Sequence, residues 1–327
     1  MGKRGLMAFS MENYKYVQDI LARRRTEAED KARRNTAWVH EHSEEIREID
    51  RKLSSTGFAL IRAAMDKAPD VRERVAALRE ENLALQARRA ALLREMGLPE
   101  NYTAVIPVCA ACKDAGHLDS GAMCACMRAL LVEAGYRSSG LGSLLKKQSF
   151  DNFSLHFYEG DARRLATVAL ERAKEFAESF EKTGQNLLFM GGTGLGKTHL
   201  STAIAKRAIE RGFDVVYETA QNVISDFEYD RFKSGYGQSE DVPRSEKYFS
   251  CDLLILDDLG VEMSNQFTLS ALYNVINTRI NLGKSMLVST NLGQKALLER
   301  YDERITSRLF GEFNPYLFRG TDIRLQK

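Results

Sequence analysis

The sequence predicts an α/β protein in which a parallel sheet follows a long helical region. Two apolar runs, 186–190 and 252–256, have the length and composition of buried parallel strands. A glycine-rich loop joins the first run to a helical pattern from His199 to Arg211. This alternation of strand and helix is typical of a parallel sheet that helices cover. Residues 11–96 are rich in Arg, Glu and Ala and have a helical pattern almost throughout.

The loop after the first run has the composition of a nucleotide-binding loop. Its residues are Gly191, Gly192, Thr193, Gly194, Leu195, Gly196, Lys197 and Thr198. In such loops the glycines let backbone N–H groups surround the phosphates, the lysine reaches the β and γ oxygens, and the hydroxyl binds Mg²⁺. Because strand, loop and helix occur in the required order, we interpret Lys197 and Thr198 as ligands of ATP and Mg²⁺.

Two carboxylates, Asp257 and Asp258, follow the second apolar run. Ligands of open α/β sheets bind at the carboxyl edge, where these residues would lie beside the loop. We expect Asp257 to hold Mg²⁺ through water and Asp258 to polarise the water that attacks the γ-phosphate. Without the loop, the same pair would indicate only a turn.

From about 150 to 327 the chain resembles the AAA+ ATPases of the DnaC/DnaI/IstB type, most closely the DnaI-like replicative helicase loaders. Besides the loop and the paired carboxylates, three stretches carry the resemblance: 287–291 (Leu-Val-Ser-Thr-Asn), 303–309 (Glu-Arg-Ile-Thr-Ser-Arg-Leu) and 319–324 (Arg-Gly-Thr-Asp-Ile-Arg). The first is similar to the family's sensor strand, the second to its arginine-finger helix and the third to its C-terminal ending.

The resemblance implies roles for three polar residues. Asn291 would place the attacking water near the γ-phosphate. Arg304 and Arg308 would share one face of a helix, and Arg308 would reach the nucleotide of a neighbouring subunit, so that hydrolysis occurs in an assembly. From the residues alone, both arginines are equally well explained as solvated surface residues, and Asn291 as a turn asparagine.

Only a short tail follows Arg308, whereas AAA+ ATPases commonly carry a helical lid after the arginine finger. The shortened end agrees with the DnaC/DnaI/IstB branch. It leaves two roles for Arg324, which are contact with the nucleotide and pairing with Asp322 or another acid.

Two features bear on the cellular location and on nucleic-acid binding. No apolar stretch is long enough to span a membrane and the N-terminus has too short an apolar core for a signal peptide, so we expect a cytoplasmic protein. The formal net charge is +2. Contact with nucleic acid must therefore come from local basic patches.

Four of the five cysteines lie close together, at Cys109, Cys112, Cys124 and Cys126. In a cytosolic protein this clustering favours a metal over disulfides, and four thiolates suit tetrahedral Zn²⁺. The second pair is more closely spaced than the first, so His117 is an alternative ligand. We predict a closed, structural zinc site, similar to the Cys-rich module of DnaI-like loaders. Cys251 stands apart and is expected in the core.

The helical region contains two apolar faces, divided by Gly57 and by the step at 68–70. One face comprises Ile46, Ile49 and Leu53. The other is a heptad-like stripe of Val71, Val75, Leu78, Leu85, Leu92 and Met96, which Asn82 and Arg89 interrupt. Two such helices most simply pack as an antiparallel hairpin. A charged helix pair can be only a spacer, but its position before the metal module favours a docking arm for another protein. Trp38 is expected to be a packing residue.

Rings and basic residues alternate between 223 and 236. We predict that a DNA-binding site is formed by Phe227, Arg231, Lys233 and Tyr236. Bases of single-stranded DNA stack on rings while the phosphates meet cations. In the resembling family this position carries a helix that initiators and loaders use along DNA. Helical aromatics equally form core, so both interpretations remain open.

We therefore expect an α/β AAA+ P-loop NTPase with a parallel sheet and no C-terminal lid, preceded by an α-helical hairpin and a small zinc-binding module. The predicted domains are a helical partner-docking arm at 1–100, a four-cysteine zinc module at 101–135, a linker at 136–160 and the ATPase domain at 161–327.

The resemblance implies an ATP-dependent loader that delivers the hexameric, DnaB-type replicative helicase to single-stranded DNA. The N-terminal region would grip the helicase, the ATPase domain would self-associate, and the cofactors would be ATP, Mg²⁺ and Zn²⁺. One alternative is an IstB-like transposition helper, against which the cysteine module argues. The other is an ATP-switched binding adaptor without significant turnover, which an Asp258→Asn variant would distinguish.

Overall fold

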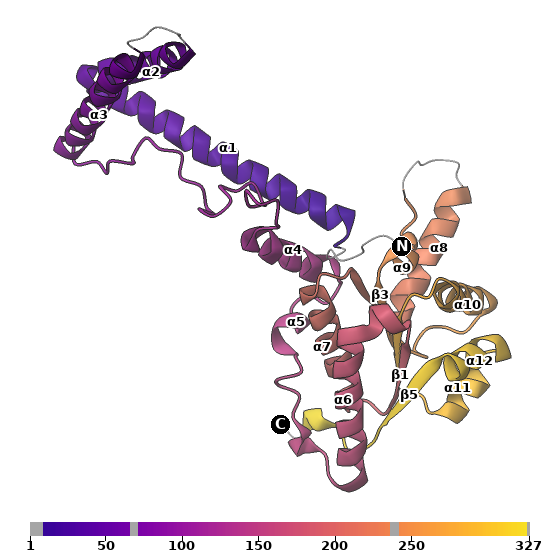
Figure 1. Cartoon of the computed structure of the whole chain (residues 1–327). Helices are drawn as coiled ribbons and strands as arrows, with labels where there is room; N and C mark the ends of the chain where they lie inside the picture. The colour runs from indigo at the N-terminus through magenta and orange to yellow at the C-terminus, as the bar shows by residue number, and fades with distance from the viewer. Residues whose placement is uncertain (1–8, 66–70, 236–241, 326–327) are drawn as a thin grey trace. The chain divides into compact units, whose positions relative to one another are not determined.

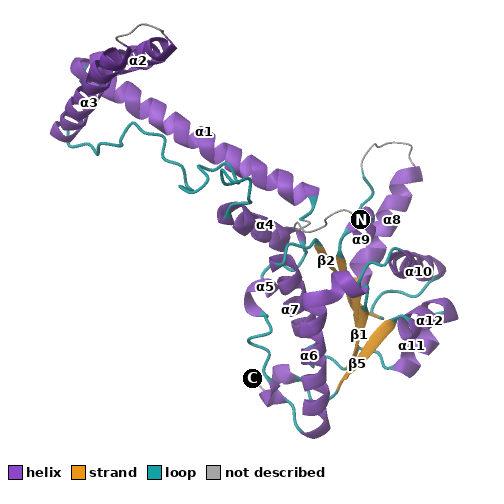
Figure 2. Ribbon diagram, in the orientation of Figure 1, coloured by secondary structure: helices purple, strands orange, loops and turns teal. Residues whose placement is uncertain are grey.

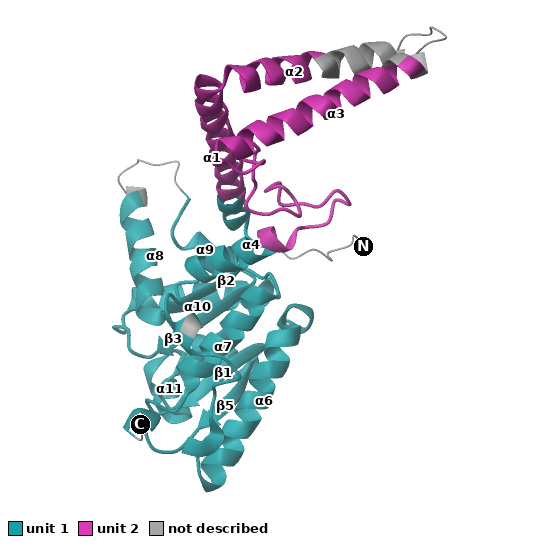
Figure 3. Ribbon diagram, turned by 90° about the vertical axis from the view of Figure 1, so that its left-hand side faces the viewer, with its two compact units in different colours: residues 1–17, 128–327 teal, residues 18–127 magenta. Residues whose placement is uncertain are grey.

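The computed structural model describes residues 9–65, 71–235 and 242–325, which divide into two compact units (Figure 3). The smaller unit comprises residues 18–127, and the larger comprises residues 1–17 and 128–327.

The larger unit is built on a five-stranded sheet with the strand order β2-β3-β4-β1-β5. Figure 2 shows its strands in orange. Every pairing between its strands is parallel. The strands are β1 Asn186–Gly191, β2 Val215–Thr219, β3 Leu253–Leu259, β4 Met286–Thr290 and β5 Phe313–Phe318. β1, β3 and β4 are mostly buried apolar runs, as expected of parallel strands that are covered on both faces.

Helices cover both faces of this sheet (Figure 1). Alternate strand residues enter two separate apolar clusters: Leu187 packs with α6 and α7, and Leu188 packs with α8, α10 and α12. The helices described in the unit are most of α4 Ala125–Ser138, then α5 Leu144–Lys147, α6 Gly160–Thr183, α7 Lys197–Glu210, α8 Ala220–Gly235, α9 Glu246–Ser250, α10 Gln266–Asn281, α11 Gln294–Arg300 and α12 Glu303–Gly311, with the 3-10 turns η1 Leu155–Phe157 and η2 Ile323–Leu325. The predicted α/β fold is confirmed.

The chain after α12 forms a strand that the sequence analysis does not predict. β5 pairs in parallel with β1 at the edge of the sheet and contains Pro315. A proline cannot donate a ladder hydrogen bond, but an edge strand tolerates it. Within the described residues no helical lid follows α12.

Residues 136–160, for which the sequence predicts a linker, pack into the core of the larger unit. Leu141, Leu145, Phe153 and Tyr158 are buried in the same apolar cluster as α6 and α7. The Tyr158 hydroxyl also donates a 2.9 Å hydrogen bond to the carbonyl of Leu195 in the glycine loop. This segment is therefore part of the ATPase core and not a free tether.

The smaller unit contains most of α1 Met11–His42, together with α2 Glu44–Met65 and α3 Val71–Glu95. α2 and α3 lie side by side as the predicted hairpin (Figure 3). A break that the sequence analysis does not predict separates α1 from α2 at Ser43, whose hydroxyl accepts the Ile46 N–H at 3.2 Å as a helix cap. α2 continues through Gly57, and residues 66–70 lie outside the described residues.

A small apolar cluster holds the base of the hairpin. Its buried members are Val39, Ile46, Ile49, Leu92 and Leu93. Beside it an ion pair explains why a charged residue interrupts the apolar stripe: Arg89 Nε lies 2.6 Å from Asp50 Oδ1, and His40 Nε2 lies 2.8 Å from Asp50 Oδ2. Burial alone would raise the pKa of Asp50, but hydrogen bonds from Arg89 and His40 hold this pKa below its usual value.

Trp38 stacks on His42 with ring centroids 4.0 Å apart and meets Tyr102 edge-on, but it is 40% exposed and so is only partly packed. None of the helices that the structure describes is long and apolar enough to cross a membrane.

Candidate nucleotide and metal sites

The glycine loop connects β1 to α7 and leaves no room for side chains at two positions. Gly194 and Gly196 have φ angles of +72° and +87°, a left-handed conformation that glycine adopts without strain. A Cβ atom at Gly194 would lie 1.7 Å from Asp322 Oδ1, and one at Gly196 would lie 2.6 Å from the Tyr158 hydroxyl oxygen. The packing of the unit therefore requires glycine at both positions.

A pocket of about 490 Å³ lies over this loop, a volume suited to a small-molecule cofactor. Most of the predicted ligands line it, namely Thr193, Gly194, Leu195, Gly196, Lys197, Thr198, Asp257, Asp258 and Asn291. The segment before α6 contributes apolar side chains, among them Leu144, Phe153 and Phe157. The fold thus brings together residues from three strand ends, as the sequence predicts.

Lys197 begins α7 and is almost fully buried. Its Nζ donates hydrogen bonds to the carbonyls of Gly191 and Gly192, at 2.7 and 2.8 Å, and to Asn291 Oδ1 at 2.8 Å. Burial lowers the pKa of Lys197, while the negative charges of Asp258 and Asp257 oppose that shift. The loop, the lysine and Asn291, which follows β4, therefore form one connected group.

Asp257 is buried at the end of β3, where three hydroxyl groups surround its carboxylate. Tyr217 donates to Oδ2 at 2.6 Å, Ser289 donates to Oδ1, and Thr198 Oγ1 lies 3.4 Å from Oδ2. Thr198 and Asp257 are adjacent oxygen ligands, the type that Mg²⁺ prefers. The residues present therefore fit a magnesium ion next to the glycine loop.

Tyr217 and Ser289 belong to no motif that the sequence reveals. Both lie inside apolar strands, and only the register of β2 and β4 against β3 brings their hydroxyls to Asp257. Burial and the nearby Asp257 carboxylate raise the pKa of Tyr217, so that it stays a hydrogen-bond donor.

Asp258 has a left-handed backbone, with φ +53°, which is uncommon for a residue other than glycine. The β3–β4 ladder shifts register between Leu256 and Leu259, as in a β-bulge, and such bulges commonly re-aim a side chain next to an active site. Asn291 Nδ2 donates to Asp258 Oδ1 at 3.3 Å. Burial and the charge of Asp257 raise the pKa of Asp258, which favours acceptance of a proton from water.

Arg304 and Arg308 both lie on α12 and face α10. Arg308 Nε donates to Asn277 Oδ1 at 3.1 Å, and the Arg304 guanidinium lies 5.5 Å from the centroid of the Tyr273 ring. Neither arginine lines the pocket of its own chain. That placement is compatible with action on a neighbouring subunit, which stays a prediction.

The predicted DNA-binding residues that the structure describes, Phe227, Arg231 and Lys233, do not form one surface. Phe227 is half-buried and packs against Tyr248, with ring centroids 6.3 Å apart, so its ring belongs to the core. Arg231 lies 5.3 Å from the ring of Phe267 and is exposed. Lys233 lies 5.9 Å from the ring centroid of Tyr229 on the same helix. Tyr236 lies outside the described residues.

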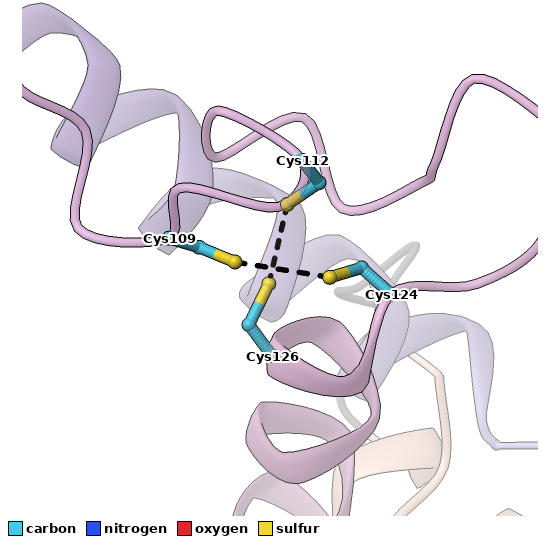
Figure 4. A group of neighbouring side chains, drawn as sticks. All are labelled: Cys109, Cys112, Cys124 and Cys126. Carbon is cyan, nitrogen blue, oxygen red and sulfur yellow. Dashed lines mark hydrogen bonds between the residues drawn. The ribbon is translucent and has the colours of Figure 1, made fainter.

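The four clustered cysteines converge in the smaller unit (Figure 4). All four Sγ atoms lie within 4.8 Å of one another, with Cys109 and Cys124 at 3.8 Å and Cys112 and Cys126 at 3.4 Å. A tetrahedral zinc ion with the usual Zn–S bond length would separate its sulfurs by about 3.8 Å. The donor set therefore fits Zn²⁺, and the cluster of possible metal donors consists of the four cysteines without His117.

A tight turn shapes this cluster. Lys113 and Asp114 both have positive φ angles, 52° and 58°. The buried carboxylate of Asp114 accepts the N–H groups of Val108 and Cys109, at 2.8 and 3.0 Å, and so fixes the first ligand. Backbone hydrogen bonds, chiefly from Cys112, lower the pKa of Cys109 to about 7, whereas burial raises the pKa of Cys126.

The parallel sheet, the glycine loop and the acids at the end of β3 define an AAA+ ATPase. A family model described as IstB-like ATP binding protein matches residues 137–308, more than half of the chain. The chain belongs to this family.

Curated relatives agree with this assignment. YdaV of Escherichia coli (strain K12), described as uncharacterized, is 28% identical over 186 residues, which cover 56% of this chain and 69% of that protein. The replicative helicase loader DnaC of the same organism is 25% identical over 197 residues, 60% of this chain and 77% of that protein. Among solved structures, the DnaC helicase loader matches with 23% identity and a TM-score of 0.43, over 52% of this chain and 98% of that one.

Proposed function

We propose that this protein uses ATP to load a DnaB-type replicative helicase onto single-stranded DNA. The observation that carries this proposal is the similarity to the replicative helicase loader DnaC, which extends over 77% of that protein. The pocket at the glycine loop supplies the ATPase that such a cycle requires.

In this proposal, residues Gly191 to Thr198 bind the phosphates, and Thr198 and Asp257 hold Mg²⁺. Bound Mg²⁺ would neutralise charge on the phosphates. Asp258 accepts a proton from the attacking water, which Asn291 helps to place. Arg308 reaches the nucleotide of a neighbouring subunit, with Arg304 beside it, so that turnover depends on assembly.

We propose that the smaller unit binds the helicase. The docking arm at 1–100 and the zinc module at 101–135 would provide its contact surface, and the ATPase domain at 161–327, with the segment at 136–160, would hold DNA. The hairpin of α2 and α3 supports this, because more than half of the side chains that the structure describes in each helix are exposed. Release of the loader would follow ATP hydrolysis.

For DNA, we propose Arg231 and Lys233 on α8 as the phosphate contacts. Phe232, which is 70% exposed on the same helix, is better placed to stack on a base than the half-buried Phe227. Substituting both basic residues by alanine should weaken binding and reduce the dependence of affinity on salt. An unchanged salt slope would remove them from the DNA site.

The test is mass photometry of the full-length protein mixed with the replicative helicase of its host, with and without ATP. Crosslinking mass spectrometry of any complex then locates the contact. The proposal expects a discrete complex and crosslinks from Lys31 and Lys113 in the smaller unit, with Lys174 and Lys206 of the larger unit as internal controls. Absence of a complex under both nucleotide conditions would contradict helicase loading.

The family description favours one second candidate, a transposition helper similar to IstB. That function predicts a complex with a transposase and none with the helicase. An Asp258→Asn variant separates both ATP-driven functions from a simple ATP-switched adaptor. If this variant binds ATP, does not hydrolyse it and still completes partner delivery, the adaptor is the better description.

A further inference from the structure

The turn that follows Asp258 has an unusual distribution of side chains. Val261 and Met263, which are 67% and 82% exposed, flank Glu262, which is only 1% exposed. Burial of a carboxylate costs free energy, and an apolar side chain gains nothing from exposure to water. The fold therefore reverses the usual preference at three successive positions. This reversal indicates that the Glu262 carboxylate has a specific task inside the protein.

The two oxygens of this carboxylate meet donors from two different elements. Oε2 of Glu262 accepts the backbone N–H of Gly260 at 2.9 Å, and Oε1 accepts the hydroxyl of Tyr301. Arg300 Nε lies 3.9 Å from Oε1, and the same guanidinium donates to the backbone carbonyl of Glu262. Burial and the hydrogen bond to Glu262 raise the pKa of Tyr301, so that it stays a donor. Glu262 thus joins the turn after β3 to the end of α11.

The backbone of this turn needs a restraint of this kind. Asp258 and Gly260 have φ angles of +53° and +106°, and the Val261 N–H donates to the Asp258 carbonyl at 3.3 Å. A left-handed conformation at a residue other than glycine persists only where the surrounding structure holds it. Glu262 holds the N–H group that lies two residues after Asp258, whose side chain lines the nucleotide pocket.

The other end of this contact is a firm point of attachment. Tyr301 and Ile305 are both buried in the apolar cluster on one face of the sheet. Tyr301 ends α11, and the next residue, Asp302, caps α12 by accepting the Ile305 N–H at 3.0 Å. One carboxylate therefore connects the turn of the proposed base with the junction of α11 and α12.

We propose that Glu262 is a positioning residue for ATP hydrolysis, which holds the Asp258 turn against the junction of α11 and α12. This inference rests on the role of Asp258 as base that is proposed above. A carboxylate suits the task, because two donors face two oxygens that carry no hydrogen. A glutamine would turn its NH₂ group toward one of these donors and leave that donor unpaired.

The test compares single-turnover hydrolysis of ATP with equilibrium binding of ATP, both measured on the full-length protein with Mg²⁺. Glu262→Gln should slow hydrolysis about tenfold, as expected when a reacting group is slightly displaced. The Kd for ATP should change little, because Lys197 and the glycine loop keep their contacts.

A double variant separates this role from a general effect on folding. Tyr301→Phe removes one of the two donors, so the amide oxygen of a glutamine at 262 can accept the Gly260 N–H while its NH₂ group faces the ring. Glu262→Gln combined with Tyr301→Phe should therefore hydrolyse ATP faster than Glu262→Gln alone. Two independent losses of stability would instead make the double variant the slower one.

Glu299→Gln is the matched control, because Glu299 is an exposed carboxylate of α11 that pairs with Lys295 at 3.9 Å. Its rate and its Kd should stay as in the wild type. Three results would overturn the proposal: a normal rate in Glu262→Gln, a loss of ATP affinity as large as the loss of rate, or a double variant that is no faster than Glu262→Gln.

The same measurements separate this inference from the functions on which it builds. Near-normal hydrolysis in Asp258→Asn, together with slow hydrolysis in Glu262→Gln, would refute the proposed base and with it this role of Glu262. Failure of helicase loading would appear as a missing complex in mass photometry and would leave the single-turnover rates as they are.

Discussion

The nucleotide site and the cysteine cluster are held in place by different forces. The nucleotide residues lie at the edge of a sheet whose strands are buried between two apolar clusters. The cysteines lie in a segment where residues 101–122 form only turns, bends and a single bridge, and where Val105, Ile106 and Val108 are more than half exposed. The first site is therefore supported by the core, and the second would need a bound metal to hold its shape.

Removal of the metal is the strongest test of this difference. Treatment with a chelator, or the variant Cys112→Ser, should release one zinc ion per chain and make residues 101–127 sensitive to protease. Structural zinc contributes on the order of 10 kcal/mol to the folding of such modules. The only tryptophan, Trp38, lies in the smaller unit, so its fluorescence reports on that unit alone.

The larger unit should keep its nucleotide affinity after the metal is removed. Cys251→Ala, which removes a buried thiol outside the cluster, is the control and should leave the zinc content unchanged. Two results would contradict the view that the cysteine cluster depends on a metal. One is a native protein that contains no zinc, and the other is protease resistance that survives chelation.

At the nucleotide site, Asp258→Asn should strongly slow ATP hydrolysis without changing the structure of the site. The amide keeps the volume of the carboxylate but cannot accept the proton of the attacking water. We expect the rate of hydrolysis to fall about 10²- to 10⁴-fold in single-turnover experiments, while the Kd for ATP changes little. Asp161→Asn, at an exposed carboxylate of the same unit, should behave as the wild type. Near-normal hydrolysis in Asp258→Asn would remove this residue from the role of base.

The two units should also respond oppositely to acid. In the larger unit, burial and the neighbouring Asp252 raise the pKa of Asp214 from 3.8 to about 6. The Asp214 carboxyl therefore binds its proton more tightly in the folded protein than in the unfolded chain. Its negative charge lowers the free energy of unfolding by the full amount above pH 6 and has no such effect below pH 4. In the cysteine module, by contrast, protonation of the thiolates releases the metal as the pH falls.

Asp214→Asn should accordingly stabilise the larger unit at pH 8 by up to about 3 kcal/mol, and should have no such effect at pH 4. Hydrogen exchange of peptides from β2 and β3 measures this locally. The control is Asp161→Asn, an exposed carboxylate whose removal should give no gain at either pH. A gain of equal size at both pH values would show that charge burial is not its cause.

The same contrast explains what the sequence could predict. Buried parallel strands are continuous apolar runs, so β1 and β3 are recognisable, and the glycine loop and the cysteines are recognisable from spacing alone. β5 is not, because an edge strand with Pro315 mixes exposed and buried positions. Phe227 could not be assigned to core or DNA contact, since that choice depends on its tertiary neighbours Tyr248 and Phe249.

The hydroxyl contacts to Asp257 were equally beyond the sequence, because strand register and not spacing along the chain creates them. Tyr217→Phe tests their role by removing only the hydroxyl that donates to Asp257 at 2.6 Å. The carboxylate keeps its contacts with Ser289 and Thr198, so we expect a moderate effect. The Mg²⁺ concentration for half-maximal ATPase activity should rise by about tenfold, in line with other groups that orient metal ligands.

Nucleotide affinity in the absence of Mg²⁺ should not change in Tyr217→Phe, because the tyrosine acts only through the metal ligand. Tyr136→Phe is the matched control, since it removes a half-buried hydroxyl that bonds Glu210 away from the pocket. Equal Mg²⁺ dependence in Tyr217→Phe and the wild type would mean that Asp257 is held well enough by its other contacts. In that case the sheet, without the Tyr217 hydroxyl, is enough to position Asp257. The nucleotide site would then depend even more on the core, in contrast to the cysteine cluster, which is expected to depend on its metal.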